Sequence, residues 1–384
     1  MAILSDFHLG YERFEEDALA QASAAFSRAL ELADLIIIAG DIFDSRTPSN
    51  EALTNAIRLF RKGAVKAGAK RVDGAGPPVV AIHGTHERRA RGLVNPVEIL
   101  EAAGLLVKVH AGKAIFEKEG ERVAVHGLGG VPEEYARDAL RAVGFQPVEK
   151  CFNVFVFHQS LRELLPFSES FMSIEDLPEG FDLYINGHHH RAGVMEVYGK
   201  KLLLPGSTVV TQMKKEETCQ KGFYLFDTQT KKEEFVPIPT RPFFYEEVEV
   251  KDASVNDVIT AVKKAAEALV AKAEKPIVKI HVSGTLAKGI EPTNLDFRSI
   301  EKSFEGKAYL EIESELTSMS LSDQIAQLRE LRQKKLSVKE MGLEILRARL
   351  KEAGIEANNP QDILDLLDLL ATDSEAALKR FLGR

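Results

Sequence analysis

The stretch Leu35-Ile36-Ile37-Ile38-Ala39-Gly40-Asp41 decides the fold of this chain, because a run of apolar residues ends there directly in a carboxylate. A continuous, largely β-branched run is typical of a strand that is buried on both faces. The same arrangement recurs further along the chain. Apolar runs at 79–82, 153–157 and 182–186 lead into Gly84-Thr85-His86-Glu87, His158 and His188-His189-His190.

Helical segments separate these runs. Apolar spacing predicts helices over roughly residues 15–33 and 49–67, and residues 95–104 have a proline near their start and a glycine at their end. Alternating strands and helices indicate an α/β layered domain, in which loops at the carboxyl ends of the strands gather into one site. We therefore expect the polar residues that follow the strands to meet.

The composition changes near residue 240, where the proline-rich stretch 236–244 predicts a linker. The residues after it have the pattern of a small α+β unit, and from about residue 320 apolar residues recur at helical spacing. We expect a first domain over residues 1–238, a second over 239–315 and a helical region over 316–384.

Overall composition is that of an ordinary globular protein, with 384 residues, 45% hydrophobic and 28% charged. Two cysteines in no metal-like spacing predict no disulfide framework and fit a reducing cytosol. The start of the chain lacks a basic region followed by an apolar one, so we expect no secretion signal. A net charge of −8 argues against a protein that coats nucleic acid nonspecifically, although bound metal ions would supply local positive charge.

The histidines are concentrated in the first half, with nine of ten in residues 1–190. Because strand side chains alternate with a period of two, Asp6 and His8 are predicted to face one ion together. The same argument predicts that His188 and His190 converge while His189 points away. Asp41, at the end of its own strand, has two carboxylate oxygens with which to bridge two ions.

These residues form a candidate metal site. Its predicted ligands are Asp6, His8, Asp41, His158, His188 and His190. Mixed carboxylate and imidazole ligands suit manganese, iron or zinc, and a pair of ions is suited to clamping a phosphodiester for attack by water. His86 is the candidate proton donor to the leaving oxygen.

Simpler interpretations hold for most of these residues taken singly. A lone histidine is more often structural, and Asp41 by itself could cap a helix. We assign structural or surface roles to the remaining histidines, which are His83, His110, His126, His189 and His281. The charged runs 87–91 and 214–217 are typical of solvated faces, but the first follows His86 directly and is equally consistent with phosphate contact.

Several motifs resemble the calcineurin-like metallophosphoesterase superfamily. They are D6-x-H8, G40-D41-x-x-D44, G84-x-H86-E87, H158 and G187-H188-x-H190. Their context, including "SDFHLGYERF", "AGDIFDSRTPS", "LLLPGST" and "KGFYLFD", is similar to the nuclease subunit of the archaeal and bacterial double-strand-break repair complex of the MRN/SbcCD type. The resemblance covers roughly residues 1–320.

The resemblance implies a four-layer α/β phosphoesterase sandwich, a small α+β cap that contacts DNA, and C-terminal helices that bind an ABC-type ATPase subunit. It implies a cytoplasmic, nucleoid-associated homodimer with two Mn²⁺ ions, acting as a 3′ to 5′ exonuclease on double-stranded DNA and an endonuclease on single strands and hairpins. By the same resemblance, Asp6, His8, Asp41 and His190 hold the first ion. Asp41, His158 and His188 hold the second, and His86 is catalytic without being a ligand.

One residue departs from the family pattern. The family has asparagine before the catalytic histidine, where its amide oxygen binds the second ion, and this chain has Thr85. A threonine hydroxyl is a shorter and weaker ligand, so we expect a weaker second site. Two alternatives to a nuclease therefore stay open: a largely inactive DNA-binding scaffold subunit and a general phosphodiesterase.

Two further expectations concern binding surfaces. Arg88, Arg89 and Arg91 are the candidate contacts to DNA phosphates, and such contacts carry no sequence specificity. Apolar residues at helical spacing in 363–378 fit either a helical hairpin that packs on itself or a helix that docks on a partner's coiled coil. The resemblance favours docking.

Overall fold

The computed structural model describes residues 1–318 except 67, 91, 166–170 and 288. The predicted helical region at 316–384 therefore lies almost wholly outside the described residues. The described chain divides into two compact units, one of Met1–Tyr245 with Ala273–Lys279 and one that contains Glu246–Lys272 and continues from Ile280. None of the described helices is long and apolar enough to cross a membrane.

Two mixed sheets form the centre of the first unit. The six-stranded sheet has the order β13-β12-β1-β2-β4-β5. Its strands are β1 (Ala2–Leu4), β2 (Ile36–Ala39), β4 (Val79–Ile82), β5 (Val107–Lys108), β12 (Gly222–Asp227) and β13 (Lys232–Pro237). The seven-stranded sheet has the order β10-β11-β9-β8-β7-β6-β3. Its strands are β3 (Lys70–Arg71), β6 (Gly112–Lys118), β7 (Glu121–Leu128), β8 (Phe152–Phe157), β9 (Leu183–Asn186), β10 (Gly193–Val197) and β11 (Lys200–Leu204).

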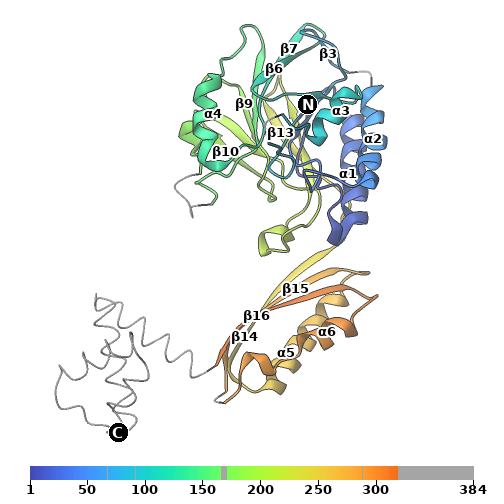
Figure 1. Ribbon diagram of the computed structural model, residues 1–384, viewed down its shortest axis with the longest axis vertical. Coiled ribbons are helices and arrows are strands. Elements are labelled where there is room, and N and C mark those ends of the chain that lie inside the picture. The colour runs from blue at the N-terminus through green and yellow to red at the C-terminus, as the bar shows by residue number, and fades with distance from the viewer. Residues whose placement is uncertain (67, 91, 166–170, 288, 319–384) are drawn as a thin grey trace, which may run out of the picture. The chain divides into compact units, whose positions relative to one another are not determined.

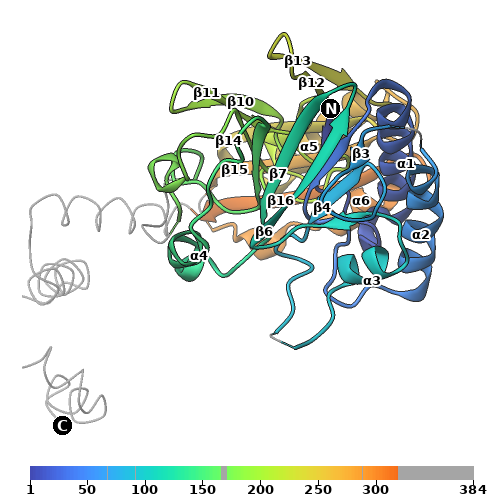
Figure 2. The same cartoon turned by 90° about the horizontal axis from the view of Figure 1, so that it is seen from above.

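Helices cover the outer face of each sheet. Helices α1 (Glu15–Leu32), α2 (Asn50–Ala64) and α3 (Pro96–Ala102) lie on one side of the pair of sheets, and α4 (Ala136–Val143) lies on the other (Figures 1 and 2). Helices α2 and α3 begin with side-chain caps from Ser49 and Asn95. The arrangement of helix, sheet, sheet and helix confirms the predicted four-layer α/β fold.

Strand β2 packs its side chains into two hydrophobic clusters, one on each face of the sheet. Ile36 and Ile38 pack in the cluster that also contains Phe26 and Phe60 of the helices. Ile37 points the other way, into the cluster between the sheets with Val154 and other residues of β8 and β9. The continuous apolar run is therefore explained by burial on both faces.

Parallel pairing aligns the carboxyl ends of the central strands. In the first sheet Leu4 pairs with Ile38, and Ala39 pairs with Ile82. In the second sheet Phe157 pairs with Asn186. The loops that follow β1, β2, β4, β8 and β9 therefore leave the two sheets at corresponding ends, as the α/β pattern predicts.

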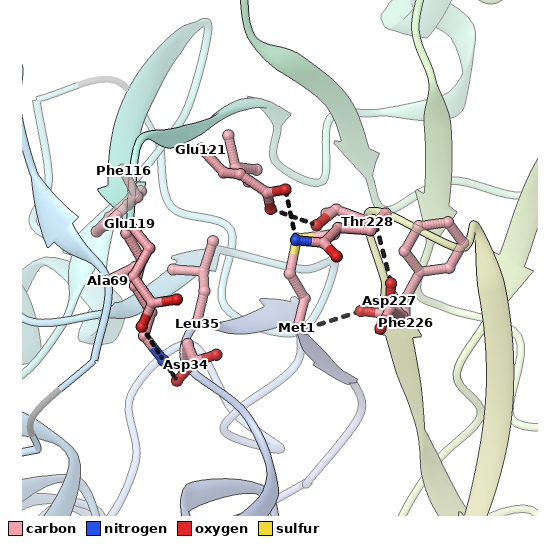
Figure 3. Close-up of a pocket in the computed structure, with 13 residues that line it drawn as sticks. Met1, Asp34, Leu35, Ala69, Phe116, Glu119, Glu121, Phe226, Asp227 and Thr228 are labelled. Atoms are coloured by element: carbon pink, nitrogen blue, oxygen red, sulfur yellow. Dashed lines mark hydrogen bonds and ion pairs between the residues drawn. The ribbon is translucent and has the colours of Figure 1, made fainter.

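A pocket lies at the opposite, amino-terminal end of β1 (Figure 3). The Met1 ammonium group donates to the Phe226 carbonyl at 2.8 Å, and Lys118 pairs with Asp34 at 2.6 Å. The residues that line this pocket include several carboxylates but no histidine or cysteine. It is therefore separate from the histidine-rich loops.

The second unit is built on a three-stranded sheet. The sheet has the order β14-β15-β16, formed by β14 (Phe243–Ala253), β15 (Ile277–Leu286) and β16 (Tyr309–Ser318). Helices α5 (Val255–Val270) and α6 (Phe297–Ser303) lie beside the sheet (Figure 1). Ser254 caps α5 with a reciprocal contact to Asp257, which satisfies two of the backbone groups that a helix start leaves unpaired. The predicted small α+β unit is found here, with its elements in the order strand, helix, strand, helix, strand.

Candidate metal centre

The five loops at the carboxyl ends of β1, β2, β4, β8 and β9 carry all six predicted ligands and His86. The ligand atoms fall into overlapping groups of three whose atoms all lie within 4.8 Å of one another. The groups are Asp6, His8 and His190; Asp41, His158 and His188; and His8, Asp41 and His86. All of the predicted ligands are buried except His188 and His190, which are half-buried.

The first group surrounds a carboxylate oxygen of Asp6. His8 Nε2 and His190 Nε2 each lie 3.8 Å from Asp6 Oδ1, and the two imidazole nitrogens are 3.2 Å apart. Three atoms with lone pairs thus point toward one another.

Outer partners define which nitrogen of each imidazole carries hydrogen. His8 Nδ1 lies 3.0 Å from Asp44 Oδ1, and His190 Nδ1 lies 2.7 Å from Thr211 Oγ1. A carboxylate only accepts, so the hydrogen of His8 sits on Nδ1 and leaves Nε2 with a lone pair. This pattern of a ligand histidine held by an outer oxygen is typical of metal sites.

The second group surrounds Asp41. His158 Nε2 lies 3.0 Å from Asp41 Oδ2, while His158 Nδ1 donates to the Ala39 carbonyl at 2.7 Å. His188 uses Nε2 for a contact of 3.1 Å with Ser160 Oγ, which leaves Nδ1 to face the group. His158 Nε2 is also 4.0 Å from Asp6 Oδ1, so the two groups are adjacent.

The two groups fit divalent cations. Asp6 Oδ1 and His158 Nε2 are buried, and neither has a hydrogen-bond partner among the described residues. Leaving such atoms unpaired is unfavourable, and a cation between them removes the penalty. The mixture of imidazole and carboxylate ligands suits first-row transition metals.

The local charges favour a cation at this position. Burial disfavours a charged imidazole, yet the Asp41 carboxylate raises the pKa of His158 to about 10. Burial likewise opposes ionisation of Asp41, but His158 and His8 lower the pKa of that carboxyl below its usual range. The centre therefore holds its carboxylate ionised and attracts either a proton or a metal ion.

The backbone at the ligands differs from the sequence prediction. Asp6, His8, Asp41 and His188 all have positive φ values, between 48° and 70°, and β1, β2 and β9 end before them. Strand alternation therefore does not position either pair. Asp6 and His8 do converge, but through left-handed loop geometry, whereas His188 and His190 face different groups. Such strained conformations persist where the surrounding structure enforces them, commonly at functional sites.

Close packing of the strand ends explains the glycines beside the ligands. A Cβ on Gly84 would lie 2.1 Å from Asp41 Oδ1, and one on Gly187 would lie 2.0 Å from the Ala39 carbonyl oxygen. The loops can approach this closely only because these two positions lack side chains.

Thr85 and His86 both contact Asp41. The His86 backbone N–H donates to Asp41 Oδ1 at 2.9 Å, and the Thr85 hydroxyl donates to Oδ2 at 3.3 Å. Glu87 is fully buried below them and accepts from the backbone N–H groups of Phe43 and Gly84, both at 2.9 Å. Thr85 thus lies beside the second group, and its hydroxyl hydrogen is directed to the Asp41 carboxylate.

His86 lies at the open side of the centre. Its side chain is 45% exposed, and its Nδ1 donates to the Asp44 carbonyl at 2.8 Å. The same nitrogen is 3.6 Å from Asp44 Oδ1, and the ring meets that of His8 edge to face at 4.9 Å between centroids. His86 is therefore oriented by Asp44, with Nε2 left for solvent or substrate.

The candidate DNA-binding arginines and His189 differ in exposure and orientation. Arg88 is exposed, whereas Arg89 is half-buried and donates to the Arg46 carbonyl at 2.9 Å. Arg91 lies outside the described residues. His189 points away from the centre, as expected, and its Nε2 accepts from the Leu161 N–H at 3.4 Å.

Three residues that surround His190 were not predicted from the sequence. Residues 214–217 were interpreted as a solvated face, but Glu217 is only 4% exposed and reaches within 3.4 Å of His190 Nδ1. Lys221 is also buried, and Thr211 contacts His190 directly. A charge pattern alone did not distinguish Glu217 from its exposed neighbour Glu216. The signal available was the motif context of Lys221, in "KGFYLFD".

The fold and the paired ligand groups define a metal-dependent phosphoesterase domain. Residues 1–231 match the calcineurin-like phosphoesterase superfamily domain, and the chain belongs to this family.

Curated relatives narrow the comparison to one kind of protein. The chain is 32% identical over 259 residues to the double-strand break repair protein MRE11 of Encephalitozoon cuniculi, covering 58% of this chain and 44% of that protein. It is 31% identical over 254 residues to the DNA double-strand break repair protein Mre11 of Methanopyrus kandleri, covering 59% and 53%. The resemblance to the repair nuclease subunit is confirmed, and the chain spans about half the length of these relatives.

Proposed function

We propose that this chain is a manganese-dependent DNA nuclease of double-strand break repair, which hydrolyses phosphodiesters at a two-metal centre. The observation that carries the proposal is the pair of adjacent ligand groups, together with the contact from the His86 backbone N–H to Asp41 of the second group. The repair function of the relatives supports DNA as the substrate class. The extra unit after the phosphoesterase domain is more than a small-molecule enzyme of this type needs.

Each ligand has a proposed place. Asp6, His8 and His190 hold the first ion together with Asp41. Asp41, His158 and His188 hold the second, with the Thr85 hydroxyl beside it. When bound, two ions would polarise the phosphodiester and lower the pKa of an attacking water.

His86 supplies the proton for the leaving oxygen in this proposal. Asp44 fixes its Nδ1 through the backbone carbonyl, so a second proton on Nε2 is presented to the substrate. The Asp44 carboxylate lies 3.6 Å from the same nitrogen and adds a second contact that orients the ring. General acid catalysis of this kind contributes roughly 10²- to 10⁴-fold to the rate.

The DNA contacts extend the predicted set by one residue. The Arg89 guanidinium donates to the Arg46 carbonyl and so joins the loop of Arg46 to the loop of His86. Arg46 and Arg88, in these two loops, are both exposed. We propose that these two contact phosphates, with Arg89 holding them in register. Arg91 is retained from the sequence as a further candidate.

The wider assembly follows the family resemblance. We propose a 3′ to 5′ exonuclease on double-stranded DNA that also cuts single strands and hairpins. Its domains are the nuclease at 1–238, a DNA-contacting cap at 239–315 and a helical region at 316–384 that binds an SMC-like ATPase. It acts as a homodimer associated with the nucleoid.

Thr85 supports one alternative. Because its hydroxyl hydrogen is used by Asp41, the second ion gains a weaker oxygen ligand than an asparagine amide would give. A chain with a poorly occupied second site would serve as a DNA-binding scaffold rather than a nuclease.

The test is cleavage of labelled double-stranded and hairpin DNA over a manganese titration, beside a small phosphodiester such as bis(p-nitrophenyl) phosphate. A nuclease cuts DNA in a manganese-dependent manner. Cleavage of the small ester alone would identify a general phosphodiesterase, and tight DNA binding without cleavage would identify a scaffold.

A further inference from the structure

We infer that Glu217 and Lys221 are positioning residues, which fix His190 as a ligand of the first ion. The inference rests on the proposed metal centre and deepens it. Both side chains are buried, at 4% and 3% exposure, and both approach His190 from the loop that leads into β12. Neither residue ligates an ion in the arrangement above.

Glu217 organises the side-chain end of His190. Its Oε1 lies 3.4 Å from His190 Nδ1, and it accepts from the backbone N–H groups of Thr211 at 3.2 Å and Gln212 at 2.7 Å. The second of these bonds uses Oε2. The carboxylate thereby holds the segment that places the Thr211 hydroxyl 2.7 Å from the same Nδ1.

These oxygens determine the tautomer of His190. With the Glu217 carboxylate and the Thr211 hydroxyl both next to Nδ1, the hydrogen of the neutral ring is favoured on that nitrogen. Nε2 then keeps its lone pair, which faces Asp6 and His8. Loss of the carboxylate would allow the hydrogen to move to Nε2 and block the ligand position.

Lys221 organises the backbone end of His190. Its ammonium group donates to the His190 carbonyl at 3.2 Å, to Ser207 Oγ at 2.8 Å and to Glu217 Oε1 at 3.4 Å. All three donors of the ammonium group therefore have an acceptor. Glu217 and Lys221 together therefore link the His190 side chain to the His190 main chain through a closed series of contacts.

A buried ion pair is a weak source of stability, because desolvation of both charges offsets their attraction. We therefore infer that the Glu217–Lys221 pair orients His190 and contributes little to stability. Within the described part of the chain the second ligand group has no such pair: His158 is held by the Ala39 carbonyl and His188 by Ser160, both neutral. The effect of removing the pair should therefore fall on the first site alone.

The experiment measures Mn²⁺ binding to the full chain by isothermal titration and electron paramagnetic resonance. The main variant is the double substitution Glu217→Gln with Lys221→Met. It removes both charges together, since either single change would leave an unpaired buried charge and endanger folding. The matched control is Glu216→Gln with Lys214→Met, which makes the same charge changes at exposed positions.

We expect the double variant to keep the second site and to bind the first ion 10- to 100-fold more weakly, the usual effect of losing an outer partner of a ligand histidine. The control should match the wild type. Wild-type affinity at both sites in the double variant would overturn the inference and leave the metal centre standing. Failure of the wild type to bind two ions would overturn the metal centre, and the inference with it.

Thr211→Val supplies a test that does not disturb the ion pair. It removes the hydroxyl beside His190 Nδ1 and keeps the side-chain shape. The first site should again weaken, and unchanged first-site affinity would count against the inference even if the double variant failed to fold. Long-range ¹⁵N–¹H spectra of the metal-free protein give a second readout, in which His190 should carry its hydrogen on Nδ1.

Discussion

His158 Nε2 lies 3.0 Å from Asp41 Oδ2 although the other ring nitrogen of His158 already donates its hydrogen to the Ala39 carbonyl. In a neutral imidazole, Nε2 is then an acceptor that faces another acceptor. The contact is favourable only when a proton or a metal ion lies between the two atoms. This relationship makes the centre dependent on a cation.

Metal binding should therefore stabilise the fold. An ion that binds only the folded chain adds about 2.7 kcal/mol to the free energy of unfolding at a hundredfold excess over its Kd. We expect Mn²⁺ to raise the Tm of the wild type and EDTA to lower it, as measured by scanning calorimetry. His158→Ala should reduce this response. A Tm insensitive to metal in the wild type would contradict the assignment of the centre.

His86→Ala should abolish most cleavage and spare the metals. The side chain is 45% exposed, and its Nδ1 is held by the Asp44 carbonyl, which is not among the proposed ligands. We expect a rate loss of roughly 10²- to 10⁴-fold, with two ions still bound by titration. His281→Ala, in the second unit, is the control. Loss of both ions from His86→Ala would show that His86 is a ligand.

Thr85→Asn should reduce the manganese concentration needed for half-maximal activity. An asparagine amide reaches further than the threonine hydroxyl, which is occupied with Asp41 at 3.3 Å. Thr85→Val, which removes the oxygen, should require more manganese than the wild type. The assay is DNA cleavage over a manganese titration. Equal titration curves for all three proteins would show that position 85 does not contribute to the second site.

Gly84→Ala should disrupt the centre from a position that carries no ligand. The added Cβ would lie 2.1 Å from Asp41 Oδ1, against a backbone and a carboxylate that cannot both move. We expect lower Tm and loss of binding to both ions, because Asp41 is the proposed ligand of both. Gly193→Ala is the matched control, since the nearest atom to its added Cβ is 3.7 Å away. Wild-type metal binding by Gly84→Ala would refute this packing argument.

Acid should destabilise the metal-free chain partly through His83. Burial, with a smaller effect from His110, lowers the pKa of His83 to about 3, and the unfolded value is about 6.5. The unfolded chain binds this proton first as the pH falls. The contribution of His83 is therefore complete above pH 6.5 and is lost toward pH 3, at up to about 1.4 kcal/mol per pH unit.

Urea unfolding in EDTA at pH 7 and pH 4.5 measures this effect. His83→Gln removes the titrating group, so the difference in unfolding free energy between the two pH values should be smaller than in the wild type. Other buried histidines, such as His126, contribute to both proteins equally. Parallel pH dependence in the two proteins would show that His83 is not the source.

Much of the candidate site was accessible from sequence because strand ends are easy to recognise. A buried apolar run followed by Asp41 or by His158 marks the carboxyl end of a strand, and parallel strands bring such ends together. Glu217 could not be recognised in this way. It stands in a charged run beside an exposed glutamate, and its burial depends on contacts with His190 and Lys221 that are distant in sequence.

The sequence by itself determined the class of fold and the set of candidate metal ligands, because alternation of strands and helices and the residues at strand ends are local features. Only the tertiary structure decided how these side chains divide into groups whose ligand atoms lie close together. The division depends on the left-handed backbone at Asp6, His8, Asp41 and His188, and an isolated segment would not adopt that conformation. Packing of the strand ends around Gly84 and Gly187 enforces it.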